Sequence, residues 1–231
     1  MSLELVEPAA GLVGAGVSLV MERLKPLAQR VVSWRERFED VFSVLLAMGI
    51  SVVVRALTAT ETGEGVRPLH LVFAIVSFDL VLYLLHRLNH TKWTWAMHKV
   101  HHTPTHFDVG MAMRGSVLYL VLFAVAFSLI ARLWALSLAE TVWMSAVFFL
   151  FQWWIHSNVA VSLGALDFVL IGPRHHAMHH MRGGFERNFG GLLCAWDQLF
   201  GTYAHPPKDM TGATFGIGDG RSSAREWLGI G

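Results

Sequence analysis

Four apolar stretches separated by polar connections dominate the hydropathy pattern of the chain. They cover residues 41–57, 69–85, 117–136 and 138–155. The second stretch would reach roughly 25 Å as an α-helix, so it needs flanking residues or local thinning to cross a hydrocarbon core about 30 Å thick. The third and fourth stretches are joined by only a short turn near Ser137, which forces their helices to lie antiparallel. The pattern therefore predicts two transmembrane helical hairpins, which make four spans.

The remaining parts of the chain are too short or too mixed in polarity to be confident spans. Residues 1–40 contain a Gly-rich apolar run that we expect to lie at the membrane interface. Residues 159–171 have the length of a re-entrant or interfacial helix, and residues 189–203 are typical of an amphipathic segment on the membrane surface. The Gly- and Pro-rich tail, residues 206–231, is expected to be flexible or lightly packed.

Lysine and arginine residues gather at one end of the predicted bundle. They precede the first span, follow the second and follow the fourth, whereas the opposite loops hold little more than Arg67 and Arg132. By the positive-inside rule, the end that carries these charges faces the cytoplasm.

Composition supports a membrane location and narrows the chemistry. Only 15% of the residues are charged and 54% are hydrophobic, whereas about a quarter of the residues of a soluble domain are charged. The net charge is +1 and no basic stripe is present, which argues against nucleic acid as a partner. The single cysteine, Cys194, excludes an intramolecular disulfide and a cysteine-based zinc or iron–sulfur site. Any metal chemistry must therefore use histidine.

Histidines form clusters at the positively charged end, at spacings that place side chains on one helical face. Residues at i, i+3 and i+4 of a helix lie close enough for their imidazoles to converge on a metal ion. A group of imidazoles near a bilayer is costly unless something compensates it, and a metal ion does so. Nine candidates exceed what one ion can bind, which favours two metal ions. They are His86, His90, His98, His101, His102, His156, His176, His179 and His180.

Several other signatures of metal or hydrolase sites are missing from the sequence. It contains no Glu-x-x-His of a carboxylate-bridged di-iron bundle, no His-Glu-x-x-His of a zinc protease and no Gly-x-Ser-x-Gly of a serine hydrolase. Imidazole binds iron, zinc, copper and nickel, so the residues alone leave the metal open. A zinc-dependent membrane hydrolase and a non-enzymatic haem- or metal-binding membrane protein both stay open as alternatives. His70, His106 and His205 stand outside the clusters and are expected to be ordinary surface or core residues.

The order of the motifs from residue 79 to residue 203 resembles the fatty acid hydroxylase superfamily, also called the sterol desaturase family. The resemblance rests on the clustered histidines together with Asn158, Asn188-Phe-Gly190 and Trp196-Asp197. Members of this family are integral membrane di-iron oxygenases that use O2 and externally supplied electrons to hydroxylate or desaturate lipids. The resemblance implies that the nine clustered histidines bind two non-haem iron ions and that O2 is a co-substrate.

The chain departs from the family pattern at two places. Gln152 stands where some relatives carry a further histidine, and the sequence after Arg114 differs from the Arg-Phe-His-Pro of many bacterial relatives. The ligand set could therefore be smaller, or His175 could act as a further ligand.

Four other side chains are candidates for hydrogen bonds to metal-binding imidazoles, which usually donate their second N–H to an acceptor. Asp79 and Tyr83 share a helical face with His86, and an aspartate within an apolar span indicates a functional site. A structural hydrogen bond to a neighbouring helix is the alternative for Asp79. Asn158 and Asp197 are the other two candidates, with capping as their alternative role.

The sequence thus predicts an all-α integral membrane protein with two transmembrane hairpins and a cytoplasmic histidine-lined helical cap. The two hairpins occupy residues 41–85 and 117–155, and the histidine-bearing segments occupy residues 86–115 and 156–205. A bacterial inner membrane and the endoplasmic reticulum both fit this organisation.

The expected function is an O2-dependent oxidoreductase that hydroxylates or desaturates a membrane lipid. No flavin or nicotinamide fingerprint is present, so electrons are expected from a separate reductase, ferredoxin or cytochrome. The identity of the lipid is left open, with sterols, fatty-acyl lipids and alkylglycerols among the candidates.

Overall fold

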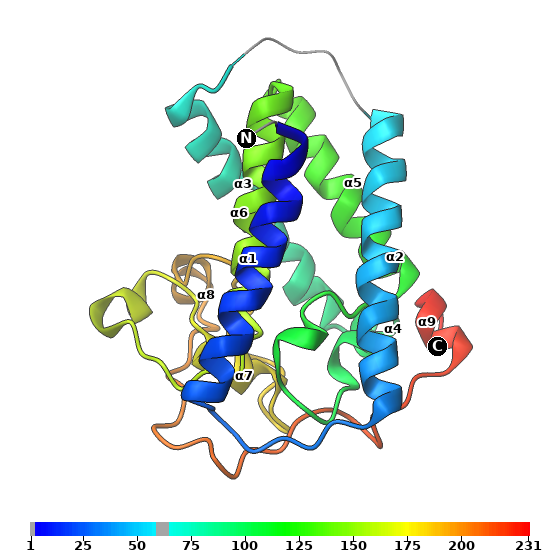
Figure 1. Ribbon diagram of the computed structural model, residues 1–231, viewed down its shortest axis with the longest axis vertical. Helices are drawn as coiled ribbons and strands as arrows, with labels where there is room; N and C mark the ends of the chain where they lie inside the picture. Colours follow the sequence, from blue (N-terminus) through cyan, green and yellow to red (C-terminus); the bar gives the residue numbers. More distant parts are fainter. Residues whose placement is uncertain (1–2, 59–64) are drawn as a thin grey trace.

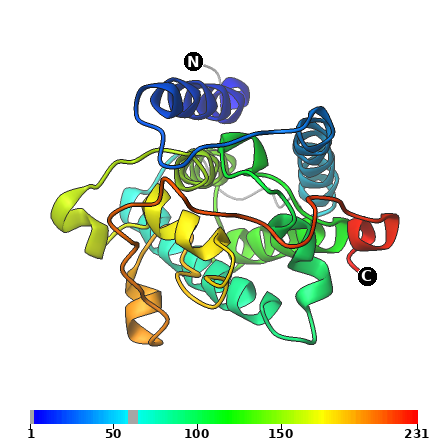
Figure 2. The same ribbon diagram turned by 90° about the horizontal axis from the view of Figure 1, so that it is seen from below.

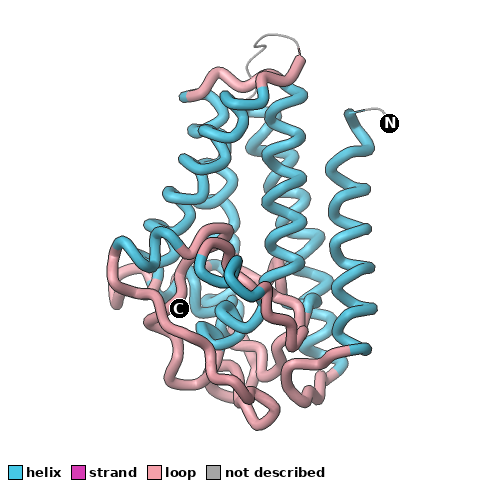
Figure 3. The backbone as a smooth tube through the Cα atoms, turned by 90° about the vertical axis from the view of Figure 1, so that its left-hand side faces the viewer, coloured by secondary structure: helices cyan, strands magenta, loops and turns pink. Residues whose placement is uncertain are grey.

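Five long helices stand side by side and form the body of the molecule, and short helices and loops gather at one end (Figures 1 and 3). The computed structural model describes residues 3–58 and 65–231, and its regular elements in those ranges are all helices. The long helices are α1 (Leu3–Leu24), α2 (Trp34–Thr58), α3 (Pro68–Asn89), α5 (Val117–Leu133) and α6 (Leu138–Ile155). This confirms the all-α prediction for the described residues.

The short elements lie at the end of the bundle that carries the clustered histidines, called here the histidine end. The short α-helices are α4 (Trp95–His98), α7 (Pro173–His180), α8 (Ala195–Leu199) and α9 (Ala224–Leu228). The 3-10 turns are η1 (Lys99–His102), η2 (Val109–Met111) and η3 (Gly164–Phe168).

Two of the long helices, α3 and α6, are long and apolar enough to cross a membrane, with mean hydropathies of 2.0 and 1.3. Helix α5 is apolar but shorter. Helix α2 begins at Trp34, well before the apolar stretch that predicted it, because Ser33 and Glu36 form reciprocal hydrogen bonds that cap its first turn. Residues 59–64 of the polar connection to α3 lie outside the described residues.

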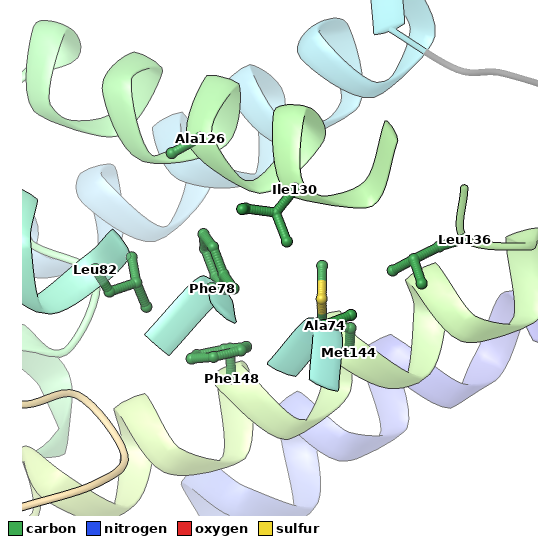
Figure 4. Close-up of a cluster of buried hydrophobic side chains, with 8 residues drawn as sticks. All are labelled: Ala74, Phe78, Leu82, Ala126, Ile130, Leu136, Met144 and Phe148. Atoms are coloured by element: carbon green, nitrogen blue, oxygen red, sulfur yellow. The ribbon is translucent and has the colours of Figure 1, made fainter. Parts of the chain in front are cut away.

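Helix α3 lies between α5 and α6 and carries the centre of the apolar core. Figure 4 shows Phe78 of α3 between Ala126 and Ile130 of α5 and Phe148 of α6. The Phe78 ring meets the ring of Phe148 edge-on, with 4.6 Å between centroids, which is a favourable aromatic geometry. This packing fixes the end of α3 from which His86 projects.

The predicted tight turn between the third and fourth apolar stretches is confirmed. Helix α5 ends at Leu133 and α6 starts at Leu138, where Ser137 and Glu140 form a capping box. Arg67, the residue before α3, donates hydrogen bonds to the Glu140 carboxylate, so the same glutamate ties α3 to α6.

Helix α1 packs along α6 instead of crossing the end of the bundle (Figures 1 and 3). Gly14 permits this close approach, because a Cβ at this position would lie 3.1 Å from Leu150 and 3.2 Å from Trp153. Near the N-terminal end of α1, Val6 packs against Val142 of α6. The interfacial position expected for residues 1–40 stays a prediction.

Two expected surface segments have irregular structures. Residues 159–171, predicted as a re-entrant or interfacial helix, form a loop that contains only η3. Asp167 accepts hydrogen bonds from Ser162 and Leu163, and Gly164 has a φ of +64°, so the backbone turns instead of continuing as a helix. Residues 189–203 likewise form a loop followed by the short helix α8.

The tail is more closely packed than its composition predicts. It crosses the histidine end of the bundle (Figure 2), and Met210 and Phe215 are buried against Leu27 and Phe107. The backbone N–H of Ile217 donates a hydrogen bond to the carbonyl of His102. The expectation of a lightly packed end was therefore wrong. The Gly- and Pro-rich composition of the tail gave no indication that it packs across the histidine end.

Candidate metal centre

The nine clustered histidines come together in two neighbouring groups at the histidine end. In each group, one nitrogen atom from every histidine lies within 4.8 Å of the corresponding atom of every other member. The five-histidine group consists of His86, His90, His98, His102 and His179, and the four-histidine group consists of His101, His156, His176 and His180.

The two histidine pairs are divided between the groups. His101 and His180 join the four-histidine group, while their neighbours His102 and His179 join the five-histidine group. Adjacent residues on a helical turn point in different directions, whereas residues at i and i+4 share a face. Each His-His pair therefore links the two groups, and this arrangement can hold two metal ions side by side.

Backbone carbonyls fix the protonation of four imidazoles. The Nδ1 atoms of His86 and His179 lie 2.8 Å from the carbonyl oxygens of Phe189 and Arg187. Those of His101 and His156 lie 2.8 Å and 2.9 Å from the carbonyl oxygens of Arg114 and Gln152. A carbonyl can only accept, so in each pair Nδ1 carries the proton and Nε2 presents its lone pair.

These lone pairs show that the site fits a metal cation. The Nε2 atoms of His101 and His156 face each other at 3.3 Å, although neither carries a proton to share. In the other group, the buried Nε2 atoms of His86 and His179 have no hydrogen-bond partner among the described residues. Two lone pairs directed at each other repel, and a cation between them removes that repulsion.

Burial keeps these imidazoles neutral, as metal binding requires. Burial, with a smaller contribution from His86, lowers the pKa of His90 to about 2. Burial lowers the pKa of His156 to about 3 and lowers that of His98 well below its usual value. The protein therefore offers unprotonated nitrogen ligands at neutral pH.

Two buried carboxylates hold the loop whose carbonyl meets His86. Asp197 accepts hydrogen bonds from the backbone N–H groups of Phe189 and Gly190, each at 2.8 Å. Asp79 accepts from the backbone N–H groups of Leu192 and Leu193 at 2.9 Å and 3.1 Å. Residues 189–193 are thus bonded at both ends, and we call them the carbonyl loop.

Glycine is required at one position of the carbonyl loop. A Cβ on Gly190 would lie 2.6 Å from the carbonyl oxygen of Leu193 and 3.0 Å from Asp197. The Asn188-Phe-Gly motif found in the sequence is therefore explained by close packing within the loop.

None of the four predicted hydrogen-bond partners bonds to an imidazole within the described residues. Asp79 and Asp197 act on the carbonyl loop, and Tyr83 bonds to the Thr202 hydroxyl at 2.9 Å. Asn158 accepts from the backbone N–H groups of Leu27 and Ala28, which anchors the segment after α1 next to His156. Any influence of these four side chains on the clustered histidines is therefore indirect.

The remaining histidines lie outside both groups. His175 is buried, and its Nε2 lies 3.3 Å from the Tyr203 hydroxyl. His70 lies 3.5 Å from Glu140, and His205 lies beside Tyr203. The structure therefore does not bring His175 to the positions where the nine other histidines converge.

His106 belongs to a separate buried ionic network between α2 and residues 105–114. Its ring nitrogens face Glu36 and Asp40 at 3.4 Å and 3.2 Å. Burial lowers the pKa of His106, but hydrogen bonds to Asp40 and Glu36 and the charge of Asp108 outweigh it, so the pKa rises to about 9. His106 is therefore a cation that pairs with carboxylates.

Arg114 contacts one of the clustered histidines, His101, and the sequence did not reveal this contact. Its guanidinium is fully buried and donates hydrogen bonds to Glu39 and Asp40, while its carbonyl accepts from His101. Four of the clustered histidines in all are held by backbone carbonyls, for which a sequence gives no direct signal. An arginine within an apolar region close to two histidine clusters was the available clue.

Two cavities meet beside the four-histidine group. The larger, of about 180 Å³, lies among α2, α3, α5 and α6, and the smaller, of about 30 Å³, reaches His86, His156 and His176. His101 and Gln152 line both. The smaller cavity can hold a molecule the size of water.

A helical bundle with two buried all-histidine groups and an apolar cavity beside them has the residues that a metal centre of the histidine-cluster type requires. The chain belongs to the fatty acid hydroxylase family, whose model matches residues 71–202. It is 33% identical to the alkylglycerol monooxygenases of Danio rerio and Homo sapiens over 63% and 62% of its length. It is 28% identical to the ornithine lipid hydroxylase OlsE of Rhizobium tropici over 82% of its length.

The chain aligns with only part of the length of each of these relatives. The aligned part spans 33% of each of these two alkylglycerol monooxygenases and 64% of the ornithine lipid hydroxylase. No solved structure matches the chain.

Proposed function

We propose that the protein is a membrane-bound di-iron oxygenase that hydroxylates a lipid with O2 and electrons from a separate donor. The observation that carries the proposal is the convergence of unprotonated imidazole nitrogens in two adjoining groups next to an apolar cavity. The family and the two kinds of relative support the reaction class, since one is named a monooxygenase and the other a hydroxylase.

Iron is the metal that fits this reaction. Imidazole ligands suit both iron and zinc, but zinc has no redox chemistry. Hydroxylating an unactivated C–H bond requires a metal that activates O2, and two bound iron ions would supply that chemistry here. The nine histidines of the two groups would be their ligands.

The protein's own residues position the ligands and exclude bulk water. Four backbone carbonyls hold Nδ1–H groups and so direct Nε2 atoms inward. The tail and Phe107 close the histidine end, since Phe107 lies 5.6 Å from His180 between ring centroids. The cavity beside His101 is the path by which an apolar substrate can reach the site.

We propose that α2, α3, α5 and α6 are the four predicted spans, with the histidine end in the cytoplasm. Helices α3 and α6 meet the length and hydropathy of a span. Helix α2 exposes Leu45, Met48 and Val52 on its outer face, as a helix in contact with lipid would. Helix α1 exposes Leu12 and Val17 beside α6, so we place it at the same depth as the spans, in place of the interfacial position expected from sequence.

Metal analysis of matched histidine variants tests the proposal. The purified protein should contain two iron ions per chain and no haem absorption band. Both His101→Ala and His179→Ala should lower bound iron and abolish lipid hydroxylation, because each removes a ligand from one group. His205→Ala should change neither, because His205 lies outside both groups.

Other outcomes would favour the alternatives. A haem absorption band would indicate a haem protein. Tightly bound zinc, with no gain of activity when iron replaces it, would indicate a hydrolase. Full hydroxylation by the double variant of His101 and His179 would refute the assignment of the site.

A further inference from the structure

Arg114 connects the histidine end to two parts of the chain that lie outside the residues matched by the family model, 71–202. One part is the beginning of α2, which carries Glu39 and Asp40. The other part is α9, which carries Trp227. Figure 1 shows α9 beside α2 at the histidine end. Two segments that are distant in sequence therefore meet at one arginine.

The guanidinium of Arg114 is held by the beginning of α2. One terminal nitrogen donates to the Asp40 carboxylate at 3.1 Å and to the backbone carbonyl of Glu36 at 3.3 Å, and the other donates to the Glu39 carboxylate. Arg114 is fully buried, and Glu39 and Asp40 are 7% and 1% exposed. Separating a buried cation from its carboxylates is strongly unfavourable, so these contacts keep the Arg114 side chain in one position.

An aromatic ring lies over the same guanidinium. The Cζ atom of Arg114 is 6.0 Å from the centroid of the Trp227 ring, which is within the range of a cation–π contact. The Trp227 ring also meets Phe42 of α2 edge-on, with 5.4 Å between centroids. A salt bridge between Lys99 and Glu226 ties α9 to η1. Helix α9 thus contacts the arginine, α2 and the turn that carries clustered histidines.

The backbone around Arg114 is held as firmly as its side chain. Its N–H donates to the carbonyl of Met111 at 2.9 Å, and the Ser116 hydroxyl donates to the carbonyl of Met97 at 2.6 Å. The Arg114 carbonyl, which accepts from His101 Nδ1 at 2.8 Å, therefore has a fixed position. An imidazole held through Nδ1–H keeps its Nε2 lone pair in one direction.

We propose that Glu39, Asp40 and Trp227 are positioning residues of the four-histidine group. They fix the arginine whose carbonyl accepts from His101, and so they set the tautomer and direction of that imidazole. This inference rests on the proposed function and adds that the two groups are supported separately. The carbonyl loop supports the five-histidine group through His86, and α2 with α9 supports the four-histidine group through His101.

The first test requires neither metal nor turnover. Metal-free full-length protein in lipid nanodiscs carries isotope-labelled histidine, and NMR shifts of the ring nitrogens report the tautomer of His101, with His101→Gln identifying its signals. We expect the Nδ1–H tautomer in the wild type and a mixture of tautomers in Glu39→Met. Asp108 accepts from Arg37 in the same ionic network but shares no hydrogen bond with Arg114 among the described residues, so Asp108→Asn should keep the wild-type tautomer. An unchanged tautomer in Glu39→Met would overturn the proposal.

The second test measures metal affinity by titrating the iron-free protein with ferrous iron in the absence of O2. The wild type should show two tight sites, whereas Glu39→Met should keep one and weaken the other by roughly 10–100-fold. Glu39→Gln keeps an acceptor for the guanidinium and should restore part of the lost affinity. Two wild-type affinities in Glu39→Met, with only a lower melting temperature, would overturn the positioning role.

A double variant identifies which group is weakened. Asp197 supports the carbonyl loop that bonds to His86 of the five-histidine group. Because Glu39 is assigned to the other group, Glu39→Met combined with Asp197→Asn should leave no tight site. One tight site remaining in the double variant would show that both changes act on the same group, and would overturn the assignment to the four-histidine group.

Neighbouring residues of α9 provide a milder matched pair. Trp227→Leu removes the ring over the guanidinium, whereas Leu228→Ala changes a side chain that is 51% exposed. We expect Trp227→Leu to weaken one site about twofold to fivefold and Leu228→Ala to keep both sites. Equal affinities in the two variants would overturn the role of Trp227.

The outcomes separate this inference from the proposed function. The expected tautomers and affinities in a protein that never oxygenates lipid would contradict the oxygenase function alone. Lipid oxygenation by the wild type, together with an unchanged His101 tautomer in Glu39→Met, would contradict the positioning role alone.

Discussion

Asp197 offers a sharp test of how the fold holds the proposed metal ligand His86 without touching it. In Asp197→Asn the side chain keeps its shape but loses its charge and one acceptor oxygen. The carboxylate now accepts from Phe189 N–H, Gly190 N–H and the Thr202 hydroxyl, at 2.8 Å, 2.8 Å and 2.6 Å. In the variant, one of the backbone N–H groups must face the amide NH2 instead.

The size of the effect follows from these contacts. A hydrogen bond to a charged group contributes about 1.5–3 kcal/mol, and a buried N–H without a partner costs about 1–3 kcal/mol. We expect the carbonyl loop to be destabilised by about 3 kcal/mol, which displaces the Phe189 carbonyl from His86 Nδ1. Loss of such an indirect support lowers metal affinity by roughly 10–100-fold. The loss should be confined to the five-histidine group, because His86 belongs to that group.

The assay is a titration of the iron-free protein with ferrous iron, together with its melting temperature. We expect Asp197→Asn to retain one tight site and to weaken the other, while Asp167→Asn keeps both. Asp167 is a suitable control because it also holds a loop at the same end but bonds to Ser162 and Leu163. Two wild-type affinities in Asp197→Asn, with only a lower melting temperature, would refute the proposed link from Asp197 to the metal.

Three further predictions concern stability. The pKa of His106 is raised from 6.5 to about 9, so its protonation contributes fully to the free energy of unfolding below pH 6.5, and this contribution is lost as the pH rises through 9. In His106→Gln, the free energy of unfolding should vary less with pH, by on the order of 3 kcal/mol, as measured by thermal unfolding. Gly190→Ala should cost about 1–3 kcal/mol, because its Cβ would meet the Leu193 carbonyl, whereas Gly212→Ala meets nothing within 4 Å and should be neutral in the same assay. Chelation of bound metal should lower the melting temperature of the wild type by about 10 °C. The same treatment should lower the melting temperature of His101→Ala by less.

The sequence predicted four of the five long helices, all but α1, and the convergence of histidines, because both follow from local periodicity. The i and i+4 spacing of His98 and His102 does place them in one group. The division of His101 from His102 was not predicted, because it depends on the 3-10 geometry of residues 99–102 and on the position of α7.

The parts that the sequence did not reveal depend on backbone groups and on distant packing. The carbonyl of Phe189 meets His86 only because Asp79 and Asp197 hold a loop more than a hundred residues away along the chain from His86. The glycines and prolines of the tail suggested weak structure, although two of its side chains, Met210 and Phe215, are buried. Such contacts have no periodic signature in the sequence.

The most direct test of the central claim is the fate of oxygen in the reaction. Iron-loaded protein, an electron donor and an alkylglycerol are exposed to isotopically labelled O2, and the lipid product is analysed by mass spectrometry. We predict one labelled oxygen atom in the product of the wild type and of His205→Ala, and none with His101→Ala. A lipid product whose new oxygen comes from water, or label that persists when His101 and His179 are both replaced, would contradict the account.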